Sequence, residues 1–439
     1  MTLRLSVIGT GYLGATHAAC MADLGFEVIG LDVDPAKIEI LRSGTVPFYE
    51  PGLDEVLARN IAAGRLTFTT SFEEAASFAD VHFICVGTPQ AAGAQKADMS
   101  QVFGSIASLT PHLHPGALVV GKSTVPVGTA VQIQAQLAKT AADGVEVAWN
   151  PEFLREGFAV QDTLHPDRLV VGVQSQRAED LLREVYAPLI ADGVPFLVTD
   201  FPTAELVKVA ANSFLATKIS FINAMSEVCE AAGADVTQLA EAIGYDPRIG
   251  NRFLAAGLGF GGGCLPKDIR AFMARAAELG AENAVAFLRE VDQINLRRRT
   301  RTVDLAREAL GGSFRDRRVT VLGASFKPDS DDVRDSPSLD VAVAMSNAGA
   351  QVVVHDPKGL VNAERVYPHM YYDADLMTAL AHAELVVLGT EWREYRELDP
   401  AALGPAVGAR TIIDARNALD PNAWRNAGWT YRALGRPTA

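Results

Sequence analysis

A glycine-rich turn close to the start of the chain constrains its fold more than any other feature. The apolar run at residues 5–8 leads directly into residues 9–14, GTGYLG, and an alanine-rich stretch follows up to Leu24. A second apolar run, residues 27–31, ends at Asp32. This order predicts a strand, a helix that begins at the turn, and a second strand parallel to the first, which is the βαβ unit of an α/β fold.

Further apolar runs continue this alternation through the first part of the chain. Residues 81–86, 118–121 and 145–149 each read as a buried strand, with helical segments between them. Continuous apolar strands that alternate with helices are typical of a parallel sheet covered by helices on both faces. We therefore expect a Rossmann-like domain over residues 1–200.

The middle of the chain has a helical pattern. Apolar residues recur at helical spacing from Thr203 to Gly233, with Pro202 just before this stretch and Gly233 at its end, as helix boundaries require. Two more helices are predicted at residues 272–277 and 284–309. We expect a central region of long helices, residues 201–312, which offers a spine between two lobes and a face for dimer formation.

The alternation of strands and helices resumes near Arg318 and resembles that of the first domain. Residues 319–323 correspond to the strand at 6–9, residues 352–357 to the strand that ends at Asp32, and residues 383–390 to the run at 79–88. The predicted fold class is thus α/β, with two Rossmann-like doubly wound domains joined by the central long-helix region. The second of these domains is expected over residues 313–439.

Composition excludes several classes of partner. The 439 residues include 39 Lys and Arg against 53 Asp and Glu, a net charge of −14, so binding to nucleic acid or to an anionic membrane is not expected. The four cysteines are widely spaced without a CxxC pair, which argues against a disulfide framework and a zinc site. No apolar run approaches the roughly 20 residues of a membrane helix, and the first strand leaves no room for a signal peptide. A soluble, cytoplasmic protein without a metal is expected.

The glycine turn predicts a dinucleotide site. In G-x-G-x-x-G the first glycine permits the tight turn, the second lets the backbone approach a pyrophosphate, and the third lets helix and strand pack closely. A carboxylate at Asp32 accepts hydrogen bonds from the adenine ribose and repels a 2′-phosphate, which selects NAD over NADP. Lys37 either lies near the ribose or is a solvated helix residue, and the sequence leaves both open. The predicted cofactor residues are Gly9, Gly11, Tyr12, Leu13, Gly14, Asp32, Lys37 and Thr88, the last in a loop after a later strand.

A second glycine-rich segment predicts a reactive cysteine. Five glycines lie within residues 257–263, and Cys264 follows them, with Pro266 in a position that suits the first turn of a helix. A thiol at a helix N-terminus is favoured as thiolate by the helix dipole and the unpaired N–H groups. Asp268 lies one helical turn further on. The other cysteines, Cys20, Cys85 and Cys229, are expected to be small buried side chains.

Three more segments place polar side chains where a ligand would bind. Lys208 and Asn212 are one turn apart on the long helix, although spacing alone leaves a solvated face equally open for the lysine. Residues 150–157 follow a strand and carry two carboxylates, Glu152 and Glu156, one turn apart, and residues 122–129 place hydroxyl groups at another strand end. In an open α/β sheet, ligands bind outside the carboxyl ends of the strands, so these loops are expected to meet a substrate.

Together these segments resemble a known family. GTGYLG (9–14), KSTVPVGT (122–129), NPEFLREG (150–157), the helix with Lys208 and Asn212, GFGGGCLPKD (259–268), and SFKPD with DDVR (325–334) are similar to the UDP-glucose 6-dehydrogenases among the nucleotide-sugar dehydrogenases. The similarity covers essentially the whole chain, in the same order. It implies a four-electron oxidation of UDP-glucose at C6 to UDP-glucuronate with two NAD+.

The resemblance also implies catalytic roles. Cys264 is the nucleophile that forms a thiohemiacetal and then a thioester, because an aldehyde gives up a hydride only after a nucleophile adds to it. Lys208 stabilises developing oxyanions with the help of Asn212, and Asp268 orients a water or serves as a base. Thr124 and Glu152 position the water, with Glu152 as the base for the final hydrolysis.

Binding residues follow from the same resemblance. Phe326 and Lys327 are implied as sugar and phosphate contacts, Arg416 as a substrate contact, and Arg248 as an arginine that reaches the active site of a neighbouring subunit, which implies a homodimer. Arg334, Thr124 and Glu156 are implied for NAD. The remaining implied substrate residues are Glu152, Phe153, Leu154, Arg155, Glu156, Lys208, Asn212 and Gly261.

Other functions remain open on the sequence. A sister enzyme acting on GDP-mannose or a UDP-N-acetylhexosamine would keep every catalytic residue, although residues 166–172 read more like the UDP-glucose enzymes. A β-hydroxyacid dehydrogenase shares the N-terminal fold but predicts neither the Cys264 loop nor a second Rossmann-like lobe. An NAD-responsive binding module would leave Lys208, Asn212, Cys264 and Asp268 unexplained. Gly263 departs from the many relatives that have Ser before the cysteine, which affects the stiffness of the loop.

Overall fold

The computed structural model describes residues 3–437, which form two compact units. The first unit contains the chain up to Ala211 together with Arg270–Leu279, and the second contains Asn212–Ile269 and the residues from Gly280 onward. The boundary at 211 falls within one long helix, α10 (Phe201–Ala232). The segment Arg270–Leu279 thus returns from the second unit to the first, and its Arg275 donates a hydrogen bond to the carbonyl of Val127 at 2.9 Å.

The described part of the first unit contains an eight-stranded sheet. Its strands are β1 (Arg4–Ile8), β2 (Glu27–Leu31), β3 (Leu66–Thr69), β4 (Val81–Ile84), β5 (Leu118–Gly121), β6 (Glu146–Trp149), β7 (Leu169–Gly172) and β8 (Phe196–Thr199). Their order is β3-β2-β1-β4-β5-β6-β7-β8. The first six strands have the 3-2-1-4-5-6 order of a Rossmann fold, which confirms the predicted class.

Two details of this sheet differ from the prediction. The pair β6 and β7 is antiparallel and meets only at Trp149 and Gly172, whereas a wholly parallel sheet was predicted. The short apolar run Leu-Val-Val-Gly of β7 carries no signal for strand direction, because apolar residues suit parallel and antiparallel strands alike. Several strands are also one or two residues shorter than their apolar runs, because apolar residues continue into the loops at the strand ends.

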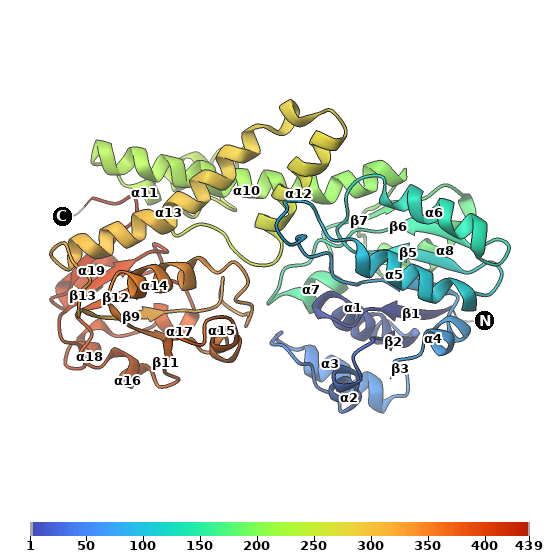
Figure 1. Cartoon of the computed structure of the whole chain (residues 1–439), viewed down its shortest axis with the longest axis horizontal. Coiled ribbons are helices and arrows are strands. Elements are labelled where there is room, and N and C mark those ends of the chain that lie inside the picture. Colours follow the sequence, from blue (N-terminus) through green and yellow to red (C-terminus); the bar gives the residue numbers. More distant parts are fainter. Residues whose placement is uncertain (1–2, 438–439) are drawn as a thin grey trace. The chain divides into compact units, whose positions relative to one another are not determined.

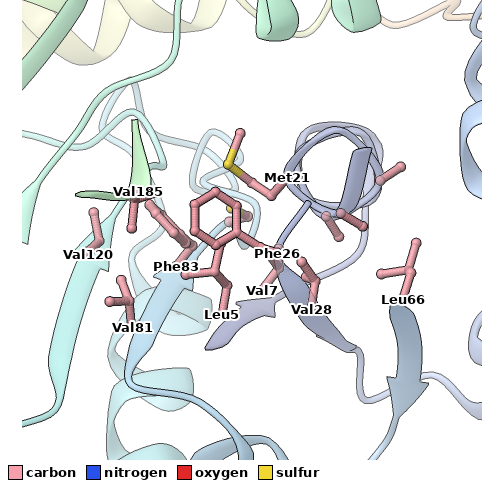
Figure 2. Packing of buried hydrophobic residues seen from close by; sticks show 14 of the residues in the cluster. Leu5, Val7, Met21, Phe26, Val28, Leu66, Val81, Phe83, Val120 and Val185 are labelled. Carbon is pink, nitrogen blue, oxygen red and sulfur yellow. The ribbon is translucent and has the colours of Figure 1, made fainter. Parts of the chain in front are cut away.

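Helices surround this sheet, and apolar side chains fill the space between the sheet and the helices. Figure 2 shows Leu5 and Val7 of β1, Phe83 of β4 and Val120 of β5 packed with Met21, all of them buried. Val86 and Cys85 follow β4 directly and border the turn at residues 9–14. The helices are α1 (Tyr12–Asp23), α2 (Pro35–Arg42), α3 (Leu53–Ala62), α4 (Phe72–Phe78), α5 (Ser100–Leu109), α6 (Thr129–Thr140), α7 (Ala159–Leu164), α8 (Gln176–Val185) and α9 (Ala187–Ala191).

The second unit contains a six-stranded parallel sheet in its described residues. The strands are β9 (Arg318–Leu322), β10 (Gln351–His355), β11 (Tyr371–Tyr372), β12 (Leu385–Leu388), β13 (Thr411–Asp414) and β14 (Thr430–Ala433), and their order is β11-β10-β9-β12-β13-β14. This is again the 3-2-1-4-5-6 order, so the predicted second Rossmann-like lobe is confirmed. Its helices are α14 (Pro337–Asn347), α15 (Leu360–Val366), α16 (Leu376–Leu380), α17 (Arg393–Arg396), α18 (Pro400–Leu403) and α19 (Pro421–Asn426).

The central helices differ in their bounds from the sequence patterns: α10 and the helix at Leu265–Glu278 are longer than predicted, and the helix at Phe287–Ala309 is shorter. Helix α10 begins at Phe201, so Pro202 lies in its first turn and not before it, as the fixed φ of proline allows. The remaining central helices are α11 (Val236–Gly244), α12 (Leu265–Glu278) and α13 (Phe287–Ala309), with a 3₁₀ turn at Glu282–Val285 where α13 was predicted to begin. Within residues 3–437, no helix is both long and apolar enough to cross a membrane.

Helix α13 lies along the second half of α10 (Figure 1, yellow-orange and green). The Ser220 hydroxyl donates to the carbonyl of Val291 at 2.7 Å, and the buried Arg298 guanidinium donates to the Ser226 hydroxyl at 2.9 Å. These buried contacts hold the two helices together inside the second unit.

Candidate active site

The glycine turn after β1 has the geometry that a pyrophosphate needs. Gly9 has φ of +89°, a conformation that favours glycine, and a Cβ there would lie 2.7 Å from Val86. A Cβ on Gly14 would collide with the carbonyl of Gly9, whereas a Cβ on Gly11 would have open space around it. The first and third glycines therefore serve the turn and the packing, and the second leaves the backbone at the start of α1 open to a ligand. The residues present thus fit a dinucleotide.

Asp32, at the end of β2, is held in place from several sides. Its carboxylate accepts hydrogen bonds from the amide and hydroxyl of Thr10 at 3.0 and 3.2 Å, from the amide of Asp34 at 3.2 Å, and from Lys37 Nζ at 2.8 Å. Burial raises the pKa of Asp32, but the hydrogen bonds and the Lys37 charge outweigh it and hold the pKa below its usual value. The carboxylate is thus ionised, and the Lys37 ammonium lies beside it.

The loops after β4, β5 and β6 are tied to one another by side-chain hydrogen bonds. The Thr88 hydroxyl donates to the carbonyl of Thr124 at 2.8 Å, and the Ser123 hydroxyl donates to the carbonyl of Val86 at 2.6 Å. Lys122 Nζ donates to Asn150 Oδ1 at 3.1 Å. Thr88 and Thr124, both predicted to be site residues, therefore lie together at the carboxyl ends of the strands.

Lys208 and Glu152 form a partly enclosed ion pair. Lys208 Nζ lies 3.0 Å from Glu152 Oε1, and Glu152 Oε2 accepts the amide of Leu154 at 2.7 Å. Lys208 is only 5% exposed, so a solvated face for this lysine, which the sequence left open, is wrong. Lys208 Nζ also lies 5.6 Å from the centre of the Phe153 ring, whose other neighbour is the Arg168 guanidinium at 4.0 Å. The predicted substrate residues Glu152 and Phe153 therefore lie next to the lysine, and the Leu154 amide holds Glu152.

The segment 150–157 is a loop and not a helix. Helix α7 begins only at Ala159, so Glu152 and Glu156 are not one helical turn apart as predicted. Gly157 has φ of +80°, which departs from helical geometry. Arg155 is exposed and paired with Asp162 at 2.7 Å.

A buried glutamate that the sequence did not single out links this loop to the glycine turn. Glu50 is 5% exposed and accepts the Tyr12 hydroxyl as well as the amides of Gly157 at 2.6 Å and Ala159 at 2.7 Å. The Tyr12 oxygen also accepts the Gly157 amide at 2.9 Å, and burial raises the pKa of Tyr12 far above its usual value. A lone glutamate next to a Pro-Gly pair reads as a solvated turn, so the sequence offers no signal for this contact.

In the second unit, Cys264 immediately precedes α12, as predicted, and is exposed. The amide of Asp268 donates to the Cys264 carbonyl at 2.9 Å, which closes the first helical turn. Cys20, Cys85 and Cys229 are buried, also as predicted, and none of the four cysteines is in a disulfide.

Asp268 is the buried acid of this group. It is 2% exposed, and its two oxygens accept hydrogen bonds from Asn212 Nδ2 at 2.6 Å and from Lys267 Nζ at 2.7 Å. The predicted residues Asn212 and Asp268 therefore meet, on different helices. Lys267 completes the pair, although the sequence analysis assigned it no role.

The glycines before Cys264 permit close packing inside the second unit. The amide of Gly262 donates to the Arg334 carbonyl at 2.9 Å, and a Cβ on Gly261 would collide with the carbonyl of Asp335. A Cβ on Gly263 would collide with the guanidinium of Arg334, which is paired with Asp332. Because the Arg334 guanidinium is the exposed end of a flexible side chain, it could move aside for a larger residue at position 263.

Arg416 joins three segments of the second unit. Its guanidinium donates to the carbonyls of Gly389 at 2.7 Å, Gly259 at 2.9 Å and Phe326 at 3.3 Å. The Lys327 ammonium lies 5.5 Å from the Phe326 ring. Arg416 therefore fastens the cysteine loop to the loop after β9 that carries the predicted phosphate contacts.

The structure thus gathers the predicted residues in two groups, each within one compact unit. Lys208 and Asn212, four residues apart along α10, belong one to each group. Arg248 belongs to the second unit but shares none of the contacts described above. Its side chain is 87% exposed and is paired with Asp246. The first group contains Gly9, Gly11, Tyr12, Leu13, Gly14, Asp32, Lys37, Thr88, Thr124, Glu152, Phe153, Leu154, Arg155, Glu156 and Lys208, and the second contains Asn212, Gly261, Cys264, Asp268, Phe326, Lys327, Arg334 and Arg416.

Three models of one protein family match successive parts of the chain. Residues 3–190 match the NAD binding domain of the UDP-glucose/GDP-mannose dehydrogenase family, residues 202–297 match its central domain, and residues 320–421 match its UDP binding domain. The chain belongs to this family. It is therefore an NAD-dependent oxidoreductase, and the GTGYLG turn lies in the family's NAD binding domain.

Individual members of the family are similar over their full length. The UDP-glucose 6-dehydrogenase of Rhizobium meliloti (strain 1021) is 40% identical, covering 99% of this chain and 100% of the relative. Among solved structures, a UDP-glucose dehydrogenase from Pyrobaculum islandicum has a TM-score of 0.92 at 39% identity, covering 99% of this chain and 98% of that one. A UDP-D-ManNAc dehydrogenase from Pyrococcus horikoshii has a TM-score of 0.87 at 26% identity, covering all of both chains.

Proposed function

We propose that this dehydrogenase oxidises UDP-glucose at C6 to UDP-glucuronate in two successive steps. The observation that carries this proposal is the exposed Cys264 at the start of α12, one turn before the buried Asp268 and its partner Asn212. A single oxidation of an alcohol needs no cysteine, whereas oxidation of an aldehyde needs a nucleophile. The choice of sugar is supported by the full-length similarity to enzymes named for UDP-glucose.

The cofactor is assigned mainly to residues of the first unit. The turn with Gly9, Gly11 and Gly14 would receive the pyrophosphate, Asp32 the adenine ribose, and the Thr88 and Thr124 loops would border the nicotinamide. When bound, NAD+ accepts a hydride from C6 at each of the two oxidation stages. We include Glu156 and Arg334 among the NAD contacts on the strength of the family resemblance.

Cys264 holds the substrate between the two stages. Its sulfur forms a bond to C6 of the aldehyde, and the carbonyl oxygen takes a proton, which gives a thiohemiacetal. Loss of a hydride from C6 and of the proton from its hydroxyl then leaves a thioester. Water adds to the thioester, the C–S bond breaks, and the carboxylate leaves while the thiolate is restored.

The charged pairs around the reaction support these steps. Lys208, whose ammonium is enclosed beside Glu152, stabilises oxyanions that develop at C6, and Asn212 assists it. Glu152 takes the proton of the hydrolytic water, which Thr124 helps to place. Asp268 orients a water or accepts a proton.

The nucleotide end of the substrate is assigned to the second unit. Phe326 and Lys327 contact the sugar and the phosphates, and Arg416 supports them through its hydrogen bond to the Phe326 carbonyl. In a chain of net charge −14, a doubly charged pyrophosphate needs such local cations. The other substrate contacts are assigned to Phe153, Leu154, Arg155, Glu156 and Gly261.

A panel of nucleotide sugars tests this proposal. We expect the purified protein to form two NADH per UDP-glucose consumed, with UDP-glucuronate as the product. Faster turnover of GDP-mannose or of a UDP-N-acetylhexosamine would identify a sister enzyme with the same chemistry. One NADH per substrate, with an aldehyde or ketone as product, would contradict the four-electron route.

We also propose that the protein works as a homodimer through α10. Three large apolar side chains, Phe214, Phe221 and Val228, recur at seven-residue spacing on this helix and are exposed by 67%, 48% and 57%. A stripe of this kind on one helix face is typical of a subunit interface. Arg248, exposed in the same unit, is the side chain that would cross to the neighbouring subunit.

Light scattering at the assay concentration checks the dimer. Phe221→Asp is expected to give a monomer with greatly reduced turnover, because a buried carboxylate disfavours the interface and Arg248 would lose its target. Val366→Asp, at an exposed apolar residue on α15, is the matched control and should remain dimeric and active. A fully active wild-type monomer would refute the proposal.

A further inference from the structure

Lys122 is a buried lysine to which the mechanism above assigns no role. It directly follows β5 and is 7% exposed. Among the described residues, its ammonium donates one hydrogen bond, to Asn150 Oδ1 at 3.1 Å. Burial lowers the pKa of Lys122, while Cys85 and Glu152 act in the opposite direction. A buried lysine stabilises the fold less than an apolar side chain of the same length would, so its presence here points to a role other than stability.

The contacts of Lys122 connect two loops of the proposed site. Gly121 and Trp149, the last residues of β5 and β6, are register partners, and the Asn150 amide donates to the Gly121 carbonyl at 2.8 Å. Lys122 and Asn150 are therefore the first residues beyond a paired strand end. Thr124 lies two residues after Lys122, and Glu152 lies two residues after Asn150.

The Asn150 side chain is held by hydrogen bonds at both its amide oxygen and its amide nitrogen. Besides Lys122, the Tyr186 hydroxyl donates to Asn150 Oδ1 at 2.6 Å, and Asn150 Nδ2 donates to the Val170 carbonyl at 2.8 Å. Asn150 and Tyr186 are both buried. Because the Asn150 side chain is held in this way, a shift of Lys122 would also shift the Asn150 backbone. Glu152 lies only two residues further along the chain, so it would move as well.

Two charged groups near Lys122 belong to the proposed site. Glu152 and Lys208 interact electrostatically with its ammonium, and the buried Cys85 and His17 are its other titratable neighbours. Of these, only Glu152 supplies a negative charge at neutral pH. Lys122 and Glu152 therefore attract each other electrostatically, which favours the approach of their two loops.

We propose that Lys122 is a positioning residue for the hydrolysis of the covalent intermediate. It holds the Thr124 loop against the Glu152 loop through its hydrogen bond to Asn150. This role rests on the proposed function, because it concerns the thioester on Cys264. It concerns hydrolysis and not hydride removal, because both loops that Lys122 joins carry the residues assigned to the water.

Lys122→Met tests the proposal. Methionine fills the same space without charge, so the variant is expected to fold. We expect a rapid burst of two NADH per active site, as in the wild type, followed by a steady rate reduced about 10- to 100-fold, since small misplacements of a catalytic group have effects of this size. Mass spectrometry of the acid-quenched enzyme should show an acyl adduct on Cys264 during turnover.

Tyr186→Phe is the matched variant. It removes the other donor to Asn150 Oδ1 and leaves Lys122 in place, so it should raise the acyl adduct above the wild-type level, but less than Lys122→Met does. Thermal unfolding of each variant separates lost stability from lost hydrolysis.

Three outcomes would overturn the role of Lys122. The first is a steady rate of Lys122→Met equal to that of the wild type, and the second is a burst of this variant slowed to the same extent as its steady rate. The third applies if Lys122→Met does not fold: it is an acyl adduct in Tyr186→Phe no greater than in the wild type. Failure of the proposed function is distinguishable, because the wild-type enzyme itself would then yield no second NADH.

Discussion

Cys264→Ala will abolish acid formation. Without the thiol, the bound aldehyde has no activated nucleophile, and water alone adds to it without comparable assistance. The nucleotide should still bind, because its contacts are assigned to Lys327 and its supporting Arg416, which lie on other segments. The measurements are the NADH yield per substrate, product analysis, and a binding titration with UDP.

Cys264→Ser will behave differently from the alanine variant. A serine oxygen can form a hemiacetal and then an ester, but an ester is a poorer acyl donor than a thioester, so acylated enzyme should accumulate. Mass spectrometry of the intact protein would detect it. Cys229→Ala, at a buried cysteine, is the control and should retain the wild-type NADH yield. If Cys264→Ala released two NADH and a uronic acid near the wild-type rate, the covalent route would be wrong.

NAD+ will be strongly preferred to NADP+. The Asp32 carboxylate is ionised and is held in place by Thr10 and Lys37. A 2′-phosphate on the adenine ribose would therefore be repelled by a negative charge of fixed position. At about 4 Å and an effective dielectric constant of about 20, repulsion between two unit charges is about 4 kcal/mol, which corresponds to roughly a thousandfold. We expect kcat/KM for NAD+ to exceed that for NADP+ by at least about a hundredfold.

Asp32→Asn will narrow this preference. The substitution removes the repelling charge and releases the Lys37 ammonium from its ion pair, so that it becomes available to a 2′-phosphate. The ratio of kcat/KM values for the two cofactors measures the effect, with Asp34→Asn as the control because that side chain caps α2. Comparable efficiency of the wild type with both cofactors would contradict the assignment of Asp32.

The features that the sequence predicts well are those encoded by local pattern. The turn at 9–14, the strand ending next to Asp32 and the position of Cys264 before a helix all depend on neighbouring residues, and all are present in the structure. The second Rossmann-like sheet was also predictable, because its apolar runs repeat the order of the first.

The features that the sequence misses depend on contacts between distant segments. The only local feature of Glu50 in the sequence is the Pro-Gly pair that follows it. Its carboxylate nevertheless accepts hydrogen bonds from the amides of Gly157 and Ala159, about a hundred positions away. The burial of Lys208 depends on the loop with Glu152, so spacing along the helix could not decide which way the lysine faces. The direction of β7 depends on how its connection runs and leaves no mark on a four-residue apolar run.

The return of Arg270–Leu279 to the first unit has a consequence for protein engineering. Exchange of sugar preference between family members is most simply attempted by recombining their N- and C-terminal halves at one crossover. A crossover in α10 would replace Arg275 together with the second unit, although this residue donates its hydrogen bond to Val127 of the first. A chimaera that respects the two units therefore needs three junctions, with residues 270–279 taken from the same parent as residues 1–211.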